Sequence, residues 1–412
     1  MREAAMQEIK GGITSAKGFW AAHTAAEIKY KGRDDMALIV SKTPCVCAGM
    51  FTSNVVKAAP VKWDMEIVKK GKPVCAIVAN SGIANACTGE YGMEICAMEA
   101  EFTADQLGVY ADEVLVASTG VIGMQMDEEK LKAGIEKLAV DLKDTPEAGT
   151  GAEKAIMTTD TRPKEIAVKL EIGGCEVTIG GMCKGSGMIH PNLCTMLAFI
   201  STDANISAKL LDKALKEAAE DTFNMISVDG DTSTNDTLLV LANGLAGNKT
   251  IKSTGKDYNA FCEGLKDVCR YLAKQMAGDG EGATALFMCE VTGADTVKNA
   301  RILAKSVICS SLTKAMIFGH DCNFGRVLCA LGYSGVKFDP DNVTLSLKSA
   351  AGEIRIFENG APLEYSEEEA GKILSEKEVS AIVDMHMGKA SATAYGCDLS
   401  YDYVKINADY RS

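Results

Sequence analysis

Two runs of alternating apolar residues, separated by a pair of glycines, place the strongest constraint on the fold of this chain. The apolar positions lie on either side of Gly173-Gly174: Ile166, Val168, Leu170, Ile172, Val177 and Ile179. A period of two is typical of a half-buried strand, and a glycine pair permits the tight turn of a hairpin. Residues 343–347 and 354–357 form a second such pair. Because hairpins join antiparallel strands, we expect antiparallel or mixed sheets rather than a doubly wound parallel fold.

Helical patterns alternate with these strands along the chain. Apolar residues recur every three or four positions in residues 127–145, after Ser207, in residues 261–276 before Gly278, and after Asp295. A hydroxyl or acidic residue at the start and a glycine at the end are typical helix boundaries. The predicted fold class is therefore mixed α/β, without an internal repeat or a low-complexity linker.

Composition limits the kinds of partner. The 412 residues suffice for one large domain or two ordinary ones, and a net charge of −13 argues against binding nucleic acid. The first residues contain no apolar core of a signal peptide, and no apolar run approaches the ~20 residues that span a bilayer. We therefore expect a cytoplasmic protein, with its 15 cysteines as reduced thiols. The four histidines are scattered and no Cys-x-x-Cys pair is present, so no metal site is expected.

The segment from Lys184 to Ile200 carries the sharpest chemical hypothesis. Glycines at 185 and 187 and a His-Pro-Asn turn precede Cys194-Thr195, which opens an apolar run. Glycine and proline set unusual backbone angles before a residue with a hydroxyl nucleophile. A chain that cuts itself before Thr195 needs this layout, since the freed threonine carries both a nucleophile and a basic amine. The simpler interpretation is a threonine that opens a buried strand.

Two glycine-containing motifs offer partners for such a nucleophile. Residues 117–123 follow a strand-like run, and the Thr119 hydroxyl and neighbouring N–H groups could form an oxyanion hole. In residues 278–284, three glycines leave the Glu281 carboxylate open to a cationic group or to proton transfer. Each motif also fits an ordinary turn at the end of a strand or helix.

Three further segments are less specific. Residues 227–237 are rich in Asp, Ser, Thr and Asn, which suit either a cation site or, as we favour, turns that cap themselves. Residues 80–89 predict a tight polar loop after a strand. Residues 401–412 alternate to the end, which predicts an anchored C-terminal strand whose Asn407 and Ser412 could line a site.

Together these motifs resemble the ornithine acetyltransferases, also called glutamate N-acetyltransferases, a family of self-cleaving enzymes of arginine biosynthesis. The resemblance extends over nearly the whole chain, through Gly11-Gly12-Ile13-Thr14, Lys31-Gly32-Arg33, Phe51-Thr52-Ser53-Asn54 and residues 80–89, 118–123, 157–161, 184–204, 280–284 and 401–412. So many motifs in order are far more specific than any one of them.

The resemblance implies a role for each matching residue. Cleavage falls between Cys194 and Thr195, and Thr195 becomes the nucleophile. Thr119 and Gly120 match the oxyanion-hole pair. The substrate-binding positions are Thr158, Lys184, Thr195, Glu281, Asn407 and Ser412. The substrates would be N2-acetylornithine and glutamate, with an acetyl ester of Thr195 between two ping-pong half-reactions.

The resemblance also implies an architecture and an assembly. The fold would be a layered α-β-β-α sandwich similar to N-terminal nucleophile hydrolases. The fragments 1–194 and 195–412 would form a heterotetramer with two copies of each, without nucleic acid, membrane or bound cofactor. The sequence leaves open whether acetyl-CoA is also a donor. Family members usually carry alanine before the nucleophile, and the Cys194 thiol could itself attack, which would move the cut to its amino side.

Two other functions fit parts of the sequence. A self-processed amidase or aminopeptidase would pass the acyl group to water instead of glutamate. A binding protein with a decayed site is the alternative outside catalysis, and the presence of Thr195, Thr119, Gly120, Lys184 and Glu281 argues against it.

Overall fold

The computed structural model describes residues 6–190 and 196–409 of this chain. They form two compact units that interleave along the sequence. Unit 1 comprises the described residues of Met1–Gly185, Asn192–Phe223 and Thr232–Leu272, and unit 2 those of Ser186–Pro191, Asn224–Asp231 and Ala273–Ser412. The predicted fragments 1–194 and 195–412 do not coincide with these units. The fragments are defined by the predicted cleavage of one peptide bond, whereas the units are defined by packing. The fragments stay a prediction.

Unit 1 is built on a nine-stranded sheet in the order β1-β6-β7-β8-β10-β3-β4-β5, with β2 also paired to β3. Its strands are β1 (Gln7–Ile9), β2 (Phe19–Thr24), β3 (Met36–Phe51), β4 (Val74–Asn80), β5 (Val114–Ser118), β6 (Glu165–Ile172), β7 (Cys175–Lys184), β8 (Leu197–Thr202) and β10 (Thr237–Ala242). Its helices are α1 (Ala59–Lys70), α2 (Gly89–Leu107), α3 (Glu128–Val140), α4 (Pro146–Ile156), α5 (Ala208–Glu220) and α6 (Lys256–Gly278), whose last residues belong to unit 2.

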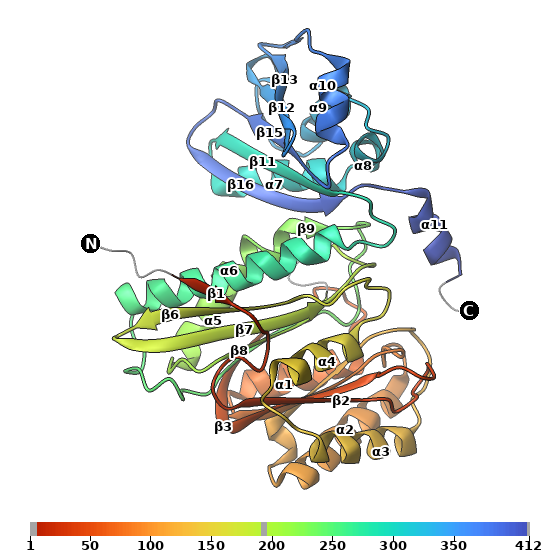
Figure 1. Ribbon diagram of the computed structural model, residues 1–412, viewed down its shortest axis with the longest axis vertical. Coiled ribbons are helices and arrows are strands. Elements are labelled where there is room, and N and C mark those ends of the chain that lie inside the picture. The colour runs from red at the N-terminus through yellow and green to blue at the C-terminus, as the bar shows by residue number, and fades with distance from the viewer. Residues whose placement is uncertain (1–5, 191–195, 410–412) are drawn as a thin grey trace. The chain divides into compact units, whose positions relative to one another are not determined.

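The long strand β3 divides this sheet into two layers. Its first half pairs with β2 and β4, its register shifts between Val40 and Cys45, and its second half pairs with β10. Alternation along β4 sends Ile77 into a core shared with α4 and β8, and Val78 into a second core under α2 and α3. On the far side, α6 packs on β6 and β7 around Gly264. The resulting order of helices, sheet, sheet and helices confirms the predicted sandwich (Figure 1).

Unit 2 contains a seven-stranded mixed sheet in the order β14-β13-β12-β15-β11-β16-β9. Its strands are β9 (Ile226–Ser227), β11 (Leu286–Ala294), β12 (Thr344–Ser349), β13 (Gly352–Glu358), β14 (Ala361–Pro362), β15 (Glu378–Asp384) and β16 (Ala390–Cys397). Its helices are α7 (Val297–Cys309), α8 (Ser311–Phe318), α9 (Phe324–Gly332), α10 (Glu367–Leu374) and α11 (Tyr401–Ala408). The apolar sides of α7 to α10 close one core with the inward side chains of the central strands, among them Phe287 and Val383.

Most predicted elements are confirmed. Both hairpins form, as β6–β7 and β12–β13, with antiparallel registers. The helix expected over 127–145 is α3, which ends earlier, at Val140. Its first turn is fixed by Asp127, whose carboxylate accepts hydrogen bonds from the N–H groups of Glu129 and Lys130. The predicted buried strand after Thr195 is β8.

The predicted C-terminal strand is wrong, because residues 401–408 form the helix α11. The alternation of this segment also fits a helical spacing, in which Tyr403 and Asn407 are one turn apart. The Asn407 amide donates to the Tyr403 carbonyl at 3.0 Å. No neighbouring strand in the described part of unit 2 pairs with the segment, so local helical bonds satisfy its backbone instead.

Two bulk properties follow from the described residues. Every cysteine among them is a free thiol. No helix in this part of the chain is both long and apolar enough to cross a membrane.

Candidate active site

The carboxyl ends of two parallel strands carry the residues predicted to bind an oxyanion. β4 and β5 pair in parallel, with Asn80 opposite Ser118. Beyond these ends the Thr119 N–H donates to the Asn80 carbonyl at 3.1 Å, and the Val121 N–H donates to the Gly82 carbonyl at 3.0 Å. The loops that follow the two strands therefore continue side by side, as the strands do.

Gly120 occupies a position that only glycine fits. Its φ is +132°, and a Cβ added there would lie 2.2 Å from the carbonyl carbon of Gly82. No side chain fits at that distance from backbone. The Thr119 N–H is engaged by Asn80, whereas no acceptor among the described residues takes the Gly120 N–H. The donors that this turn offers to a ligand are thus the Gly120 N–H and the Thr119 hydroxyl.

Lys184, the last residue of β7, connects to this turn. Its buried side chain brings Nζ to 3.3 Å from Thr119 Oγ1. An ammonium group can only donate, so the hydroxyl oxygen of Thr119 accepts and its own proton is left to point elsewhere. A hydroxyl polarised in this way is a stronger donor toward a developing negative charge.

Asp160 joins the two other predicted site residues of unit 1. Its Oδ2 accepts the Thr158 N–H at 3.0 Å, and its Oδ1 accepts the N–H of Gly185, the neighbour of Lys184, at 2.7 Å. The same Oδ1 lies 2.7 Å from Nζ of Lys164, and neither of these two side chains is exposed to solvent. One carboxylate therefore fixes the backbone at Thr158 and next to Lys184, two of the predicted substrate-binding positions.

The charge state of Asp160 follows from its neighbours. Burial alone opposes ionisation, but the ammonium groups of Lys184 and Lys164 and the hydrogen bonds that it accepts lower the pKa of Asp160 well below its usual range. The carboxylate is therefore charged at neutral pH.

The remaining described site residues lie in unit 2. The buried Glu281 donates its N–H to the Ser186 carbonyl at 2.9 Å, and its carboxylate accepts the Asn407 amide at 2.7 Å. A Cβ on Gly187 would lie 2.4 Å from the carboxyl carbon of Glu281, so this glycine leaves the space that the carboxylate occupies. Glu281 and Asn407, 126 residues apart, are thus brought into contact as an acceptor and its orienting donor.

The predicted residues Cys194, Thr195 and Ser412 lie outside the described residues. The structure describes the residues that follow the predicted Cys194–Thr195 bond from Met196 onward. The carbonyl of Met196, next to the nucleophile position, accepts the Thr237 N–H at 2.7 Å, and β8 continues into the sheet of unit 1.

Sequence reasoning missed two residues of these networks. Asp160 lay inside a motif of the resemblance, and nothing in its spacing separated it from its neighbours. Asn235 lay in the polar segment 227–237, for which we favoured a structural role. Local caps do form, as where the Asn235 N–H donates to the Ser233 hydroxyl at 3.1 Å, but the side-chain amide has remote partners that this prediction did not include. The Asn235 amide donates to the carbonyls of Ala84 at 2.5 Å and Ser118 at 2.8 Å. It therefore links the loops that follow β4 and β5.

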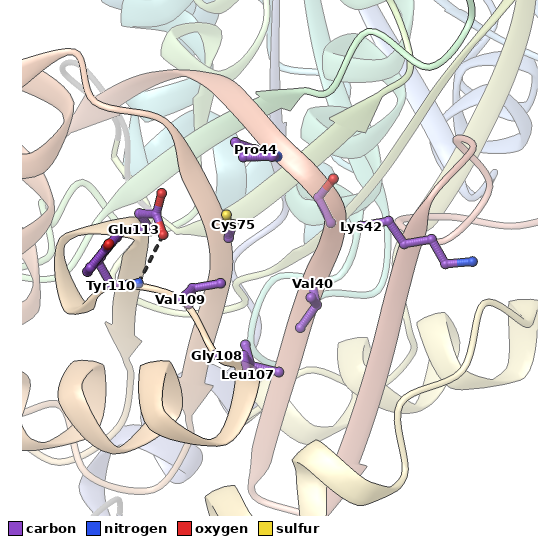
Figure 2. A pocket seen from close by; sticks show the side chains of 10 residues that line it. Val40, Lys42, Pro44, Cys75, Leu107, Gly108, Val109, Tyr110 and Glu113 are labelled. Atoms are coloured by element: carbon purple, nitrogen blue, oxygen red, sulfur yellow. Dashed lines mark hydrogen bonds between the residues drawn. The ribbon is translucent and has the colours of Figure 1, made fainter.

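A separate hollow of about 510 Å³ lies in unit 1 where β3 parts from β4. Figure 2 shows the Glu113 carboxylate accepting the Tyr110 N–H, at 2.9 Å, and the Lys42 side chain turned away from the others. The Lys42 ammonium lies 4.6 Å from the centre of the Trp20 ring. No predicted site residue lines this hollow, so it is not the candidate active site.

Comparison with known proteins identifies the family of the chain. The ArgJ family model matches residues 20–412. The arginine biosynthesis bifunctional protein ArgJ of Symbiobacterium thermophilum is 51% identical over 409 residues, which cover 99% of this chain and 100% of that protein. The protein of the same name from Bacillus subtilis is 43% identical over 405 residues, 98% of each chain. A crystal structure of the Bacillus halodurans protein is 44% identical and covers 51% of this chain and 97% of that one, with a TM-score of 0.49.

Proposed function

Because this chain belongs to the ArgJ family, we propose that it transfers the acetyl group of N2-acetylornithine to glutamate through an acetyl ester of Thr195. The chain is an N-acetyltransferase of arginine biosynthesis, as its relatives are. The identity of the nucleophile, the preceding self-cleavage and the order of the steps are the proposed part.

Self-cleavage comes first in this proposal. Thr195 Oγ attacks the carbonyl carbon of Cys194, the peptide C–N bond breaks, and the acyl group moves from nitrogen to oxygen. Water then hydrolyses the ester, which leaves a carboxylate on Cys194 and a free α-amine on Thr195. Such an amine has a reference pKa of about 7.7–8.0, so a useful fraction is neutral at pH 7 and can act as a base.

Acetyl transfer uses the same oxygen twice. The Thr195 amine takes the proton from Oγ as it attacks the acetyl carbonyl, and ornithine leaves with that proton on its α-amine. The α-amine of glutamate then attacks the ester and restores the Thr195 hydroxyl. Both tetrahedral intermediates carry a negative oxygen, for which the Thr119 hydroxyl and the Gly120 N–H are the proposed donors.

One observation supports the assignment of the oxyanion donors above the others. The Lys184 ammonium donates to the hydroxyl of Thr119, and the next residue, Gly120, lies where no other residue fits. This arrangement strengthens one donor and leaves a second unhindered. A turn with only a structural purpose requires neither.

The other proposed roles are contacts to the substrate. Glu281 would pair with a substrate amine, and Asn407 would orient its carboxylate. Lys184 would pair with a substrate carboxylate as well as polarising Thr119, and Thr158, held by Asp160, would contact the bound amino acid. Ser412 completes the set by resemblance.

The decisive experiment supplies N-acetylornithine to the purified enzyme with and without glutamate. We expect N-acetylglutamate and ornithine in equal amounts with glutamate, and an acetyl group on the fragment that begins at Thr195, seen by intact mass, without it. Free acetate released at equal rates in both would favour the amidase alternative.

Replacing N-acetylornithine by acetyl-CoA tests whether this molecule is also a donor. An intact mass without processing and without turnover would favour the binding protein.

Two further parts of the proposal concern the assembly and its place in the cell. Two copies of each fragment would form a heterotetramer, which light scattering of the cleaved enzyme tests directly. The free thiols of the described cysteines fit the reducing cytoplasm that we propose for it.

A further inference from the structure

The chain that approaches the proposed cleavage site, residues 186–190, is bonded to other segments of unit 2 at four of its five residues. The Ser186 hydroxyl donates to the Asp279 carbonyl at 2.6 Å. The Ile189 carbonyl accepts the Val228 N–H at 2.7 Å, and His190 Nδ1 lies 3.0 Å from the Ser227 hydroxyl. These bonds fix residues 186–190, the last of which lies four residues before Cys194.

Asp229 makes the strongest of these ties. Its Oδ2 accepts the Met188 N–H at 2.6 Å and its Oδ1 accepts the Ile189 N–H at 2.9 Å. The same carboxylate also accepts the Asp231 N–H at 3.1 Å and a hydrogen bond from the Tyr403 hydroxyl. Bonds to a charged acceptor are about twice as strong as neutral ones, and here two successive amides share one such acceptor.

The backbone at Met188 is held in a conformation that it would not keep on its own. Its φ is +54°, in the left-handed region, which is unfavourable for a residue with a Cβ. Successive N–H groups can converge on an anion beside a residue in this conformation, as in the anion-binding nests of other proteins. The Asp229 carboxylate is the anion that stabilises this bend.

His190 adds a tie that does not depend on charge. Burial, with the Lys305 ammonium nearby, lowers the pKa of His190 to about 4, so its imidazole is neutral at pH 7. A neutral ring nitrogen can share the hydroxyl proton of Ser227.

The partners of this segment come from the other side of the junction in sequence. Residues 186–190 precede the Cys194–Thr195 bond, whereas Ser227, Val228, Asp229 and Asp279 follow it. The bonds thus close a loop of chain that contains the scissile bond, and closing a loop removes conformational freedom from everything within it. Attack by a neighbouring hydroxyl requires atoms held within a narrow range of distance and angle.

We propose that Ser227, Val228 and Asp229 form a clamp that positions the chain for self-cleavage, with Asp229 as its principal residue. This inference rests on the proposed cleavage before Thr195. It assigns Asp229 a positioning role that is separate from the oxyanion donors and from substrate binding.

The test follows the cleavage of freshly synthesised chains over time on a denaturing gel. We expect Asp229→Asn to cleave about tenfold to hundredfold more slowly than the unaltered chain, since a small misplacement of reacting groups costs a factor of this order. Asp231→Asn removes an exposed charge two residues away and should cleave at the unaltered rate.

A direct readout of the clamp separates positioning from general damage. In the uncut Thr195→Ala chain, the amides of Met188 and Ile189 should be protected from hydrogen exchange, and Asp229→Asn should remove that protection while the melting temperature stays within a few degrees. Cleavage of Asp229→Asn at the unaltered rate, with this protection lost, would overturn the proposal.

Two other outcomes are also decisive. If Asp229→Asn does not unfold cooperatively, Ser227→Ala, which removes the hydroxyl that bonds His190 and the Cys309 thiol, decides instead. We expect it to slow cleavage several-fold, and an unaltered rate would reject the clamp. An unaltered chain that never cleaves would reject the proposed self-cleavage itself, and the clamp with it.

Discussion

At the scale of single residues, the chemistry depends on which donors remain unpaired by the fold. In the turn after β5 the Thr119 N–H donates to the Asn80 carbonyl, the Thr119 hydroxyl is polarised by Lys184, and no acceptor in the described part of the chain takes the Gly120 N–H. The turn therefore leaves two groups that can donate to a ligand. This distinguishes it from an ordinary strand-end turn.

Thr119→Ala should slow turnover by about a hundredfold to a thousandfold, equivalent to about 2.7–4 kcal/mol, because it removes one oxyanion donor. The melting temperature should change little, since the hydroxyl contributes no core packing. Steady-state kinetics with N-acetylornithine and glutamate measures the loss. Thr119→Ser keeps the hydroxyl and is the matched control. Normal turnover in the alanine variant would remove Thr119 from this role.

Thr195→Ala should leave a single uncut and inactive chain, because it deletes the oxygen that both reactions need. A denaturing gel and an acetyl-transfer assay measure the two effects. N-terminal sequencing of the fragments from the unaltered chain locates the cut, and a new terminus at Cys194 instead of Thr195 would show that the thiol is the attacking group. Two fragments from the alanine variant would contradict the assignment.

At the scale of elements, the site depends on segments far apart in sequence that are joined by few side chains. Asp160 holds the backbone of Thr158 and of Gly185, and Glu281 meets Asn407 of α11. Neither connection lies within one helix or strand, so each should respond to a single substitution without loss of the surrounding element.

Asp160→Asn should destabilise the protein by about 3–5 kcal/mol, because it leaves the Lys164 ammonium buried without its counter-ion. Its low pKa gives the sign with pH: the contribution of Asp160 is complete above the ordinary pKa of 3.8 and is lost as pH falls further. Urea unfolding at pH 7 and at acid pH measures both effects. Asp144→Asn, at an exposed position, is the control. Equal stability of the two variants would contradict the role.

Asn407→Ala should raise KM for N-acetylornithine about tenfold and change kcat less. The amide orients the Glu281 carboxylate, and one such hydrogen bond is worth about 1–1.5 kcal/mol. Initial-rate kinetics separates the two constants. Lys405→Ala, on an exposed position of the same helix, should leave both unchanged. A fall in kcat with an unchanged KM would argue against substrate orientation through Glu281.

At the scale of the whole molecule, buried carboxyl groups make stability depend on pH. Glu99 of α2 is fully buried, neither of its oxygens has a partner among the described residues, and burial raises its pKa to about 8. Burial likewise raises the pKa of Glu153 to about 8. Between pH 4.5 and 8 the folded protein keeps protons on these groups that the unfolded chain has lost.

Stability should therefore fall as pH rises through this window, by about 1.4 kcal/mol per pH unit for each such group. Glu99→Gln removes one of them and should flatten the dependence by that amount. Unfolding of the uncut Thr195→Ala chain in urea at several pH values from 5 to 8 measures it. Glu101→Gln, an exposed glutamate of the same helix, should keep the full slope. An unchanged slope in Glu99→Gln would show that this carboxyl group is ionised when folded.

The sequence by itself determined the local structure and the family. Hairpins, helix boundaries and the strand after Thr195 are decided by periodicity, caps and turns, which act over a few neighbouring residues, and β6–β7 and α3 follow those rules. Only the tertiary structure decided that Asp160 holds Thr158 and Gly185, that Asp229 fixes Met188, and that residues 401–408 form a helix. Asp160 and Asp229 have partners outside their own segments, and residues 401–408 have no strand in the described part of unit 2 to pair with. Local sequence cannot specify which distant group will satisfy a hydrogen-bond donor or a charge.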